Sequence, residues 1–356
     1  MDEATVALID RIAEGGLAGT VPPKADVVRL LALDPCSPEA SYLEERACEV
    51  AHRVSGDTGR IAGAVGIDFA PCSMNCSFCS FGERWGVIGE EVAYTEDEVI
   101  AMVRAYVEQG ATMVTLRSTE FYDLDVLQEW IADIRAQVPG SYEINMNVGE
   151  LTPERAQAIW ECGATSAYHV LRLREGEDTP FDPEVRIATI RAIAASPLLL
   201  GTCVEPIGPE HTDDELADGI LFGLECGAYS GGVMARVPVP GTPLEHAGTI
   251  SEDRLMQILA VERIVAGSQY ESIDCHPPVE RALYAGANSL TVEAGANPRD
   301  VEPGAEPWKG FTVAEAKGLL EKAGFAVRLP NPEPRVCPTP RLRTGERVPK
   351  PSGRCC

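Results

Sequence analysis

Short apolar segments of strand-like composition alternate with stretches of helical periodicity over most of the chain. We predict eight strands, at residues 60–70, 112–118, 142–148, 166–172, 198–206, 231–239, 271–275 and 288–294. Such alternation is typical of a parallel sheet, and the number of units favours an α/β fold, a (β/α)8 TIM-type barrel that is complete or nearly so. A doubly wound open sheet is the alternative. In both architectures ligands bind at the carboxyl ends of the strands.

The remaining parts of the chain divide it into four predicted regions. Residues 1–58 have amphipathic helical patterns and form an N-terminal helical region ahead of the barrel at 59–296. A C-terminal helix and short strand are expected at 297–330. Residues 331–356 are rich in Pro, Arg and Gly without periodicity, so we expect an irregular tail that carries cysteines.

The balance of charge excludes some partners. With 55 acidic and 30 basic residues the net charge is -25, which repels phosphate backbones, so we expect no nucleic-acid partner. No apolar run approaches the roughly 20 residues that span a bilayer, and the first residues lack a signal-peptide pattern. We therefore expect a cytoplasmic protein without a membrane partner, in which the twelve cysteines do not form disulfides.

Three cysteines lie close together directly after the first predicted strand. The segment "PCSMNCSFCSFG" places Cys72, Cys76 and Cys79 in a C-x3-C-x2-C spacing that lets the thiolates converge from one loop. A closed zinc site needs four ligands, so three thiolates are one too few. Three thiolates on a cubane iron–sulfur cluster would leave one iron open to a substrate or cofactor. A structural zinc loop and a chance arrangement remain as alternatives.

The cysteine segment resembles the signature of the radical S-adenosylmethionine (SAM) enzymes. This resemblance implies a [4Fe–4S] cluster on Cys72, Cys76 and Cys79, with SAM bound at the open iron through its amino and carboxylate groups. It also implies that SAM is cleaved reductively to a 5′-deoxyadenosyl radical, which abstracts a substrate hydrogen. Phe78 matches the family position near the adenine. An electron donor such as flavodoxin or ferredoxin is implied as a partner.

Other segments resemble biotin synthase, methylornithine synthase and the [FeFe]-hydrogenase maturase related to them. The resemblance covers about residues 5–325 and includes "VPVPGTPLEH" at 237–246 and "AGANSLTVEAG" at 285–295. It implies several further residues near SAM. These are Arg172, Arg174 and Arg186 on the polar side, and Ile207 and Gly208 near the adenine.

Two segments depart from the family pattern. Where many radical SAM enzymes have Gly-Gly-Glu near SAM's amino group, this chain has Ser118, Thr119 and Glu120. The substrate segment of biotin synthase is replaced by "YHVLRLREG", which speaks against dethiobiotin as the substrate. For contacts to a different small-molecule substrate the candidates are Asn145, Asn147, Glu150, His169 and His276.

The tail carries Cys337, Cys355 and Cys356, which have no apolar element to bury them. Because soft thiolates select iron–sulfur clusters or zinc, we predict that the tail holds an auxiliary iron–sulfur cluster. Cys275 or His276 would supply a fourth ligand. A loose tail with incidental thiols, or a small zinc knot, is the alternative.

These features give a primary hypothesis and two alternatives for function. The primary hypothesis is sulfur insertion at an unactivated carbon, of the biotin or lipoyl synthase type, with the auxiliary cluster as sulfur donor. A radical SAM mutase or lyase that acts on an amino acid, like methylornithine synthase, is the first alternative. A structural metal-binding protein without catalytic activity is the second.

Overall fold

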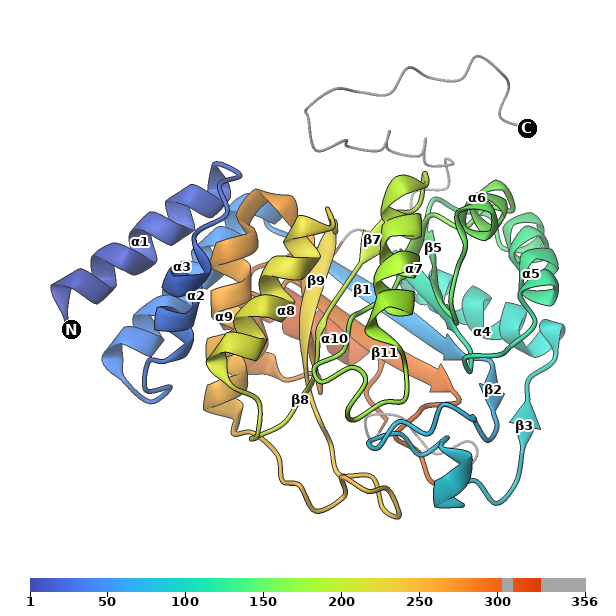
Figure 1. Ribbon diagram of the computed structural model, residues 1–356. Coiled ribbons are helices and arrows are strands. Elements are labelled where there is room, and N and C mark those ends of the chain that lie inside the picture. The colour runs from blue at the N-terminus through green and yellow to red at the C-terminus, as the bar shows by residue number, and fades with distance from the viewer. Residues whose placement is uncertain (303–309, 328–356) are drawn as a thin grey trace.

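The computed structural model describes residues 1–302 and 310–327, and its centre is a curled sheet of parallel strands (Figure 1). The strands are β1 (Thr58–Gly66), β2 (Asp68–Phe69), β3 (Val92–Ala93), β4 (Met113–Arg117), β5 (Glu143–Asn147), β6 (Ser166–Tyr168), β7 (Leu199–Gly201), β8 (Val204–Ile207), β9 (Ser230–Ala235), β10 (Ser272–His276), β11 (Ser289–Gly295) and β12 (Ala326–Val327). The α-helices are α1 (Glu3–Leu17), α2 (Lys24–Leu31), α3 (Pro38–Ser55), α4 (Glu96–Gln109), α5 (Leu124–Gln137), α6 (Pro153–Glu161), α7 (Pro183–Ala195), α8 (Asp213–Glu225), α9 (Glu252–Ala266) and α10 (Val313–Lys322).

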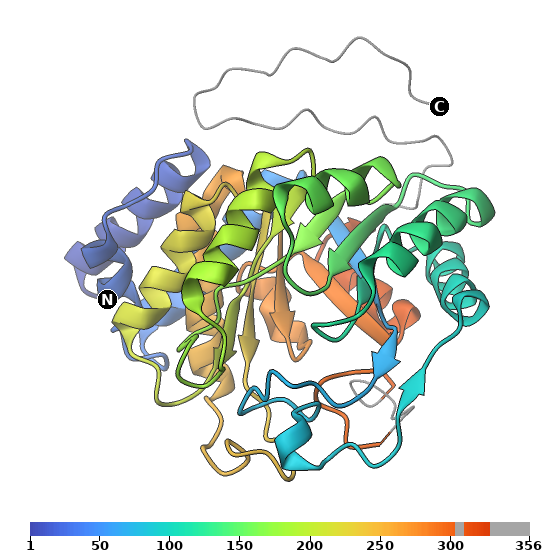
Figure 2. The same ribbon diagram turned by 45° about the vertical axis from the view of Figure 1, so that its right-hand side comes forward.

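In the parallel sheet the strands follow the order β10-β9-β7-β6-β5-β4-β1-β11, with β8 paired to β9 and β12 paired to β1. Strands β2 and β3 form a separate antiparallel pair. Helices α4 to α9 cover the outer face of this sheet, and the sheet curves around an interior that opens at the carboxyl ends of the strands (Figure 2). The parallel α/β prediction is therefore confirmed.

The junction between β10 and β11 differs from the others. Within the described residues no ladder of backbone hydrogen bonds joins these two strands. The Asn288 amide donates to the Ile273 carbonyl at 3.2 Å, and the Asp274 carboxylate accepts from the hydroxyls of Ser289 and Thr291 at 3.3 and 2.6 Å. These backbone and side-chain hydrogen bonds thus bridge the edges, and the described strands form a curled half-barrel.

One predicted strand differs in detail from the sequence-based expectation. The strand expected at 198–206 is divided into β7 and β8 at residues 202 and 203, and its pairing with β9 then shifts register between Val204 and Ile207. The segment after β10 contains a 3₁₀ helix, Glu280–Tyr284. Two more 3₁₀ turns are Glu83–Trp85 and Gly267–Gln269.

Capping residues define many of the helix ends. Thr95 and Glu98 form a capping box at α4, and Thr212 and Glu215 form one at α8. Gly110 ends α4 in the left-handed conformation, where glycine has no steric penalty. These Thr and Gly residues thus define where the helices begin and end.

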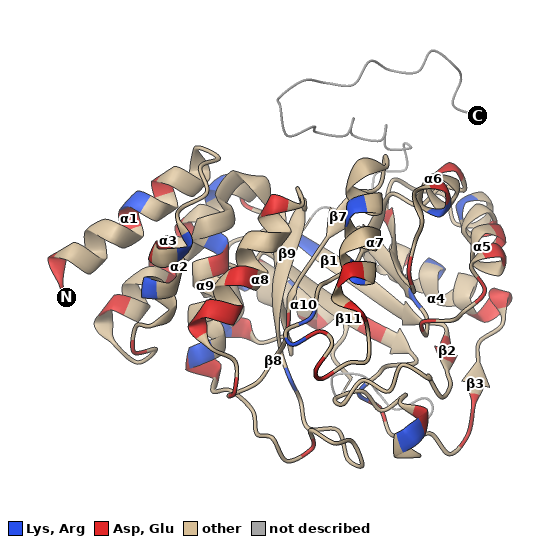
Figure 3. Ribbon diagram, viewed as in Figure 1, with Lys and Arg blue, Asp and Glu red and all other residues tan. Residues whose placement is uncertain are grey.

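Helices α1 to α3 precede the sheet and pack on the outside of α8 and α9 (Figure 1). As a result, α9 is buried along most of its length. Acidic residues are spread over outer helices such as α5 and α8 (Figure 3). Within residues 1–302 and 310–327, no helix combines the length and apolarity needed to cross a bilayer.

Helix α9 carries a buried carboxyl group, Glu262, beside the sheet. Its Oε1 accepts from the Gly232 amide at 3.2 Å, and its Oε2 has no hydrogen-bond partner. Burial raises the pKa of Glu262 to about 8, although the adjacent Arg263 opposes this shift. Glu262 therefore holds its proton in the folded chain at neutral pH.

The substitution Glu262→Gln tests this assignment. Between its ordinary pKa of 4.5 and the folded value of about 8, the carboxyl keeps its proton only in the folded state. The free energy of unfolding of the parent protein should therefore fall as pH rises through this window, by about 1 kcal/mol or more relative to the variant. Urea denaturation across the window measures this difference. The exposed Glu108→Gln is the control, and parallel curves for parent and Glu262→Gln would contradict the assignment.

Candidate functional site

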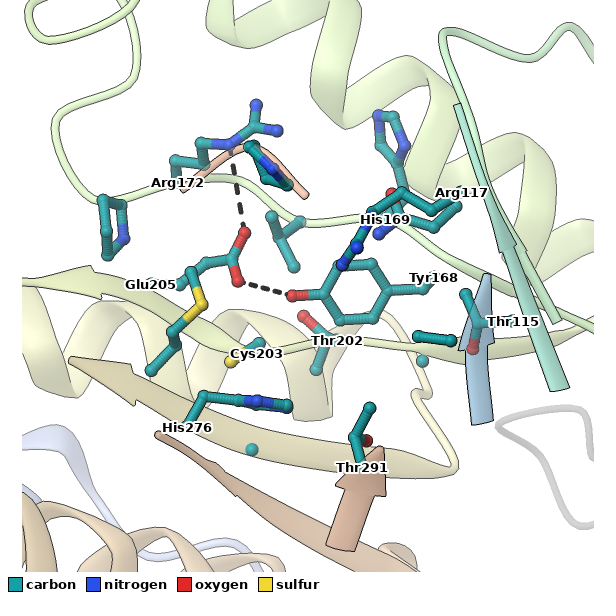
Figure 4. A pocket seen from close by; sticks show the side chains of 18 of the residues that line it. Thr115, Arg117, Tyr168, His169, Arg172, Thr202, Cys203, Glu205, His276 and Thr291 are labelled. Atoms are coloured by element: carbon teal, nitrogen blue, oxygen red, sulfur yellow. Dashed lines mark hydrogen bonds and ion pairs between the residues drawn. The ribbon is translucent and has the colours of Figure 1, made fainter. Parts of the chain in front are cut away.

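A cavity of about 290 Å³ lies inside the carboxyl end of the curled sheet. Its wall includes the three clustered cysteines, Cys72, Cys76 and Cys79, together with side chains from β4, β5, β6, β9, β10 and β11. Figure 4 labels some of the lining residues, which come from different strands and from the loops that follow them. The position is the one at which ligands bind in parallel α/β proteins.

The cysteine loop follows β2 and is folded by its own backbone. The Cys72 amide donates to the Phe81 carbonyl at 2.5 Å, and the Cys72 carbonyl accepts from the Glu83 amide at 3.1 Å. Asn75 has a φ of 50°, a left-handed conformation that Asn tolerates better than most residues. Its Oδ1 accepts from the Arg84 amide at 2.8 Å, which fixes the turn between Cys72 and Cys76.

Trp85 packs against this loop from the following 3₁₀ turn. Its Nε1 donates to the Cys76 carbonyl at 3.2 Å. A Cβ added to Gly82 would lie 2.1 Å from Trp85 Nε1, so the contact requires glycine at this position. The glycine after the third cysteine is thus explained by the close approach of the indole.

Loops after three other strands hold the cysteine loop over the cavity. The Ser77 amide donates to the Asp178 carbonyl at 2.8 Å, and the Ser77 carbonyl accepts from the Leu244 amide at 3.0 Å. The Ser80 amide donates to the Pro298 carbonyl at 2.9 Å. The "PGTPLE" segment noted in the sequence is therefore a support for the cysteine loop.

Burial strongly affects the three thiols. It raises the pKa of Cys76 to about 11 and that of Cys79 to about 12, and it raises the pKa of Cys72 as well. A bound cationic metal centre favours thiolates at such a site. Three thiols on one cavity wall, of which Cys76 is buried and Cys72 and Cys79 are half-buried, are soft donors, and they fit an iron–sulfur cluster that keeps one iron open.

Two arginines, the half-buried Arg172 and the buried Arg186, lie on the cavity wall next to the cysteines. Arg172 lies 3.9 Å from the Glu205 carboxylate, and Glu205 accepts from the Tyr168 hydroxyl at 2.6 Å (Figure 4). The Arg186 Nη1 lies 2.9 Å from Glu150 Oε1. These cationic groups can bind a carboxylate on a ligand.

Glu120 adds a titratable group close to Arg186. Its carboxylate is 3.6 Å from Arg186 Nη2. Burial raises the pKa of Glu120 to about 7, and Arg186 opposes the shift. A ligand ammonium placed here would favour the ionised carboxylate.

Many of the predicted site residues line the cavity. The lining includes Phe78, Ser118, Thr119, Glu120, Asn145, Asn147, His169, Arg172, Arg186 and His276. Glu150 is not among the lining residues but contacts two of them, since its Oε2 lies 3.2 Å from His169 Nε2. Cys337, Cys355 and Cys356 lie outside the described residues.

Three other predicted SAM contacts are not in the lining. The Arg174 side chain turns outward, with Nε 3.3 Å from Glu215 and Nη2 donating to the Glu210 carbonyl at 3.1 Å. Ile207 is buried in the apolar core. Gly208 packs against Arg236 and Glu210, so that no space remains beside it for a ligand.

Cys275 does not face the cavity. Successive side chains of a strand point to opposite faces, and its neighbours Asp274 and His276 both line the cavity. Cys275 is fully buried in the apolar core between the sheet and its outer helices. The prediction that Cys275 ligates a cluster in this cavity is therefore corrected, while His276 remains on the cavity side.

The sequence reasoning missed several polar residues of the inner wall. Arg117 and Arg299 both pair with Glu293 at 2.7 Å, and they lower the pKa of Glu293 to about 2 against the effect of burial. Asp274 and the Tyr168–Glu205 pair were missed as well. The sequence feature that could have indicated these residues is a polar side chain near the end of a predicted strand.

A second group of potential metal ligands lies near the cysteine loop, formed by Asp178, Glu210 and His211. His211 Nδ1 accepts from the Gly208 amide at 2.8 Å, so the neutral ring carries its proton on Nε2. A protonated Nε2 cannot coordinate a metal. Arg236 already pairs with Glu210, and this group is an ion-pair network.

Part of this site matches a known protein family. Residues 69–171, a segment that includes the cysteine loop, match the family model described as the radical SAM superfamily. The resemblance noted in the sequence is thereby confirmed.

Proteins of similar sequence and solved structures of similar fold match more of the chain than residues 69–171. A biotin synthase of Streptomyces avermitilis is 27% identical over 270 residues, covering 72% of this chain and 68% of the relative. One of Saccharopolyspora erythraea is 25% identical over 267 residues, covering 72% and 73%. The crystal structure of methylornithine synthase (PylB) has a TM-score of 0.74 at 16% identity, covering 89% of this chain and 97% of that one. The [FeFe]-hydrogenase maturase HydG from Carboxydothermus hydrogenoformans has a TM-score of 0.71 at 18% identity, covering 90% and 79%. These two structures show a shared fold.

The Trp85 contact gives a testable consequence. Gly82→Ala should displace Trp85 from the Cys76 carbonyl, because the new methyl group would overlap the indole. We expect at least a twofold loss of bound iron after anaerobic reconstitution, with a lower melting temperature. Gly89→Ala is the matched control, since a Cβ there meets nothing within 4 Å. Equal iron content in the two variants would show that the contact does not support the cysteine loop.

Proposed function

We propose that this chain is a radical SAM enzyme that abstracts a hydrogen atom from a small polar substrate bound in the cavity. The observation that carries the proposal is the meeting of three cavity-lining thiols and two cavity-facing arginines at the carboxyl end of the sheet. The match to the radical SAM family model over residues 69–171 includes the thiols and supports the same reading.

Cys72, Cys76 and Cys79 would hold a [4Fe–4S] cluster. When bound, the cluster and SAM supply a 5′-deoxyadenosyl radical, with the electron from a donor such as flavodoxin or ferredoxin. Arg172 and Arg186 stand where they can hold the SAM carboxylate. The polar side chains of Ser118 and Glu120 offer acceptors for the SAM ammonium, and Phe78 offers an apolar face for the adenine.

The part of the cavity wall formed by β10 and β11 offers a place for the substrate. Asp274 is half-buried there and accepts hydrogen bonds from Ser289 and Thr291. Among the described residues, its ion-pair partner is His276, at 3.8 Å. Burial raises the pKa of Asp274, and a cationic ligand would reverse that shift. A half-buried carboxylate with no Lys or Arg ion-pair partner among the described residues suits a substrate ammonium. This observation favours the mutase or lyase alternative, with an amino acid as substrate.

Sulfur insertion is the second candidate function, and the biotin synthase relatives at 25–27% identity support it. It requires a sulfur-donating cluster near the substrate. Apart from the three clustered cysteines, the described wall of the cavity has one thiol, Cys203. Sulfur insertion therefore depends on the tail cysteines Cys337, Cys355 and Cys356.

Counting iron distinguishes the two candidates. Replacing Cys72, Cys76 and Cys79 with Ala should remove about four irons per chain from anaerobically reconstituted protein, because a [4Fe–4S] cluster loses its ligands. The matched variant replaces Cys337, Cys355 and Cys356 with Ala. Under amino-acid chemistry with a single cluster it should keep the parent's iron content, whereas under sulfur insertion it should lose iron as well. No iron loss in the first variant would contradict the proposed function.

Transfer of deuterium tests the proposed substrate class. With deuterated amino acids, dithionite and SAM, we expect deuterium in 5′-deoxyadenosine for the true substrate. Asp274→Asn should lower that transfer at least tenfold because the carboxylate that holds the ammonium is lost. The exposed Asp97→Asn is the control, and mass spectrometry is the readout. Transfer that is equal in the two variants would exclude Asp274 as the ammonium site.

A further inference from the structure

An aromatic ring lies against both of the cavity-facing arginines. The ring belongs to Phe181, which is buried in the loop between β6 and α7 and lines the cavity. The Arg186 guanidinium carbon is 3.6 Å from the ring centroid, and the Arg172 guanidinium carbon is 5.7 Å from it. Both distances lie within the roughly 6 Å range of cation–π attraction.

The backbone at Phe181 is fixed by the start of helix α7. Asp182 is the N-cap, and its side chain accepts from the Glu184 amide at 3.0 Å. Pro183 occupies the first turn, where its restricted φ suits a helix. The ring is thus presented from a rigid position.

The contacts of Arg186 show what the ring contributes. At its edges Nη1 meets Glu150 at 2.9 Å and His169 at 3.0 Å, whereas Nε and Nη2 form no hydrogen bond. Their nearest carboxylates, on Glu175 and Glu120, are 3.7 and 3.6 Å away. Contacts at the edges alone leave the guanidinium plane free to tilt, and a ring against its face prevents tilting.

The two arginines also repel each other. Burial, followed by repulsion from Arg172, lowers the pKa of Arg186. The negative face of an aromatic ring offsets part of such repulsion without adding a carboxylate that would compete for the guanidinium groups. Leucine would fill a similar volume but offer no such face.

We propose that Phe181 is a positioning residue that holds Arg186 and Arg172 in the orientation in which they receive the carboxylate of SAM. This inference rests on the proposed function, because it takes SAM as the ligand of these arginines. Phe181 would thus affect the affinity for SAM through one functional group of that ligand, its carboxylate.

Two substitutions and two ligands test the inference. The dissociation constants of SAM and of decarboxylated SAM are measured by equilibrium dialysis on anaerobically reconstituted protein. Phe181→Leu should weaken SAM binding about tenfold, a loss in the range of a desolvated cation–π contact. It should change the binding of decarboxylated SAM less than twofold. Phe181→Tyr keeps the aromatic face and should bind SAM as the parent does.

The outcomes separate the inference from the proposed function. If the parent protein does not bind SAM, the proposed function fails, and the inference fails with it. If the parent binds SAM but Phe181→Leu matches it, or weakens both ligands equally, only the positioning role is overturned. Circular dichroism melting confirms folding, and Phe181→Met replaces Phe181→Leu in the comparison if the latter is unfolded.

Discussion

Backbone hydrogen bonds from three other loops hold the cysteine loop over the open end of the sheet, and the site depends on them. Ser77 bonds to Asp178 and Leu244, and Ser80 bonds to Pro298. These partners follow β6, β9 and β11, so the strands that form the cavity also place its thiols. The position of the loop over the cavity therefore depends on the curled sheet, which brings these distant segments together.

The cavity wall contrasts with the acidic exterior. The chain has a net charge of -25, yet Arg172 and Arg186 face the interior beside the thiols. Buried carboxylates offset these cations, as Glu205 does for Arg172. A ligand with both a carboxylate and an ammonium group could exchange partners with such a wall at little cost in buried charge. SAM and amino acids both have this character.

Sequence patterns were sufficient for the parallel sheet and for the cysteine loop, because both depend on local periodicity and spacing. They were insufficient for Cys275, whose side-chain direction depends on the phase of β10 against the cavity. Arg174 was also misplaced, since its left-handed backbone conformation turns it toward Glu215. The Tyr168–Glu205 bond joins residues 37 positions apart, and only the assembled sheet brings them together.

The central claim is that the three thiols hold a cluster whose open iron faces the arginine-lined cavity. Electron–nuclear double resonance on the reduced, reconstituted protein tests it directly, with SAM labelled by ¹⁷O in the carboxylate and ¹⁵N in the amino group. The account predicts that both labels couple to the cluster. A cluster signal that does not change when labelled SAM is added would contradict it.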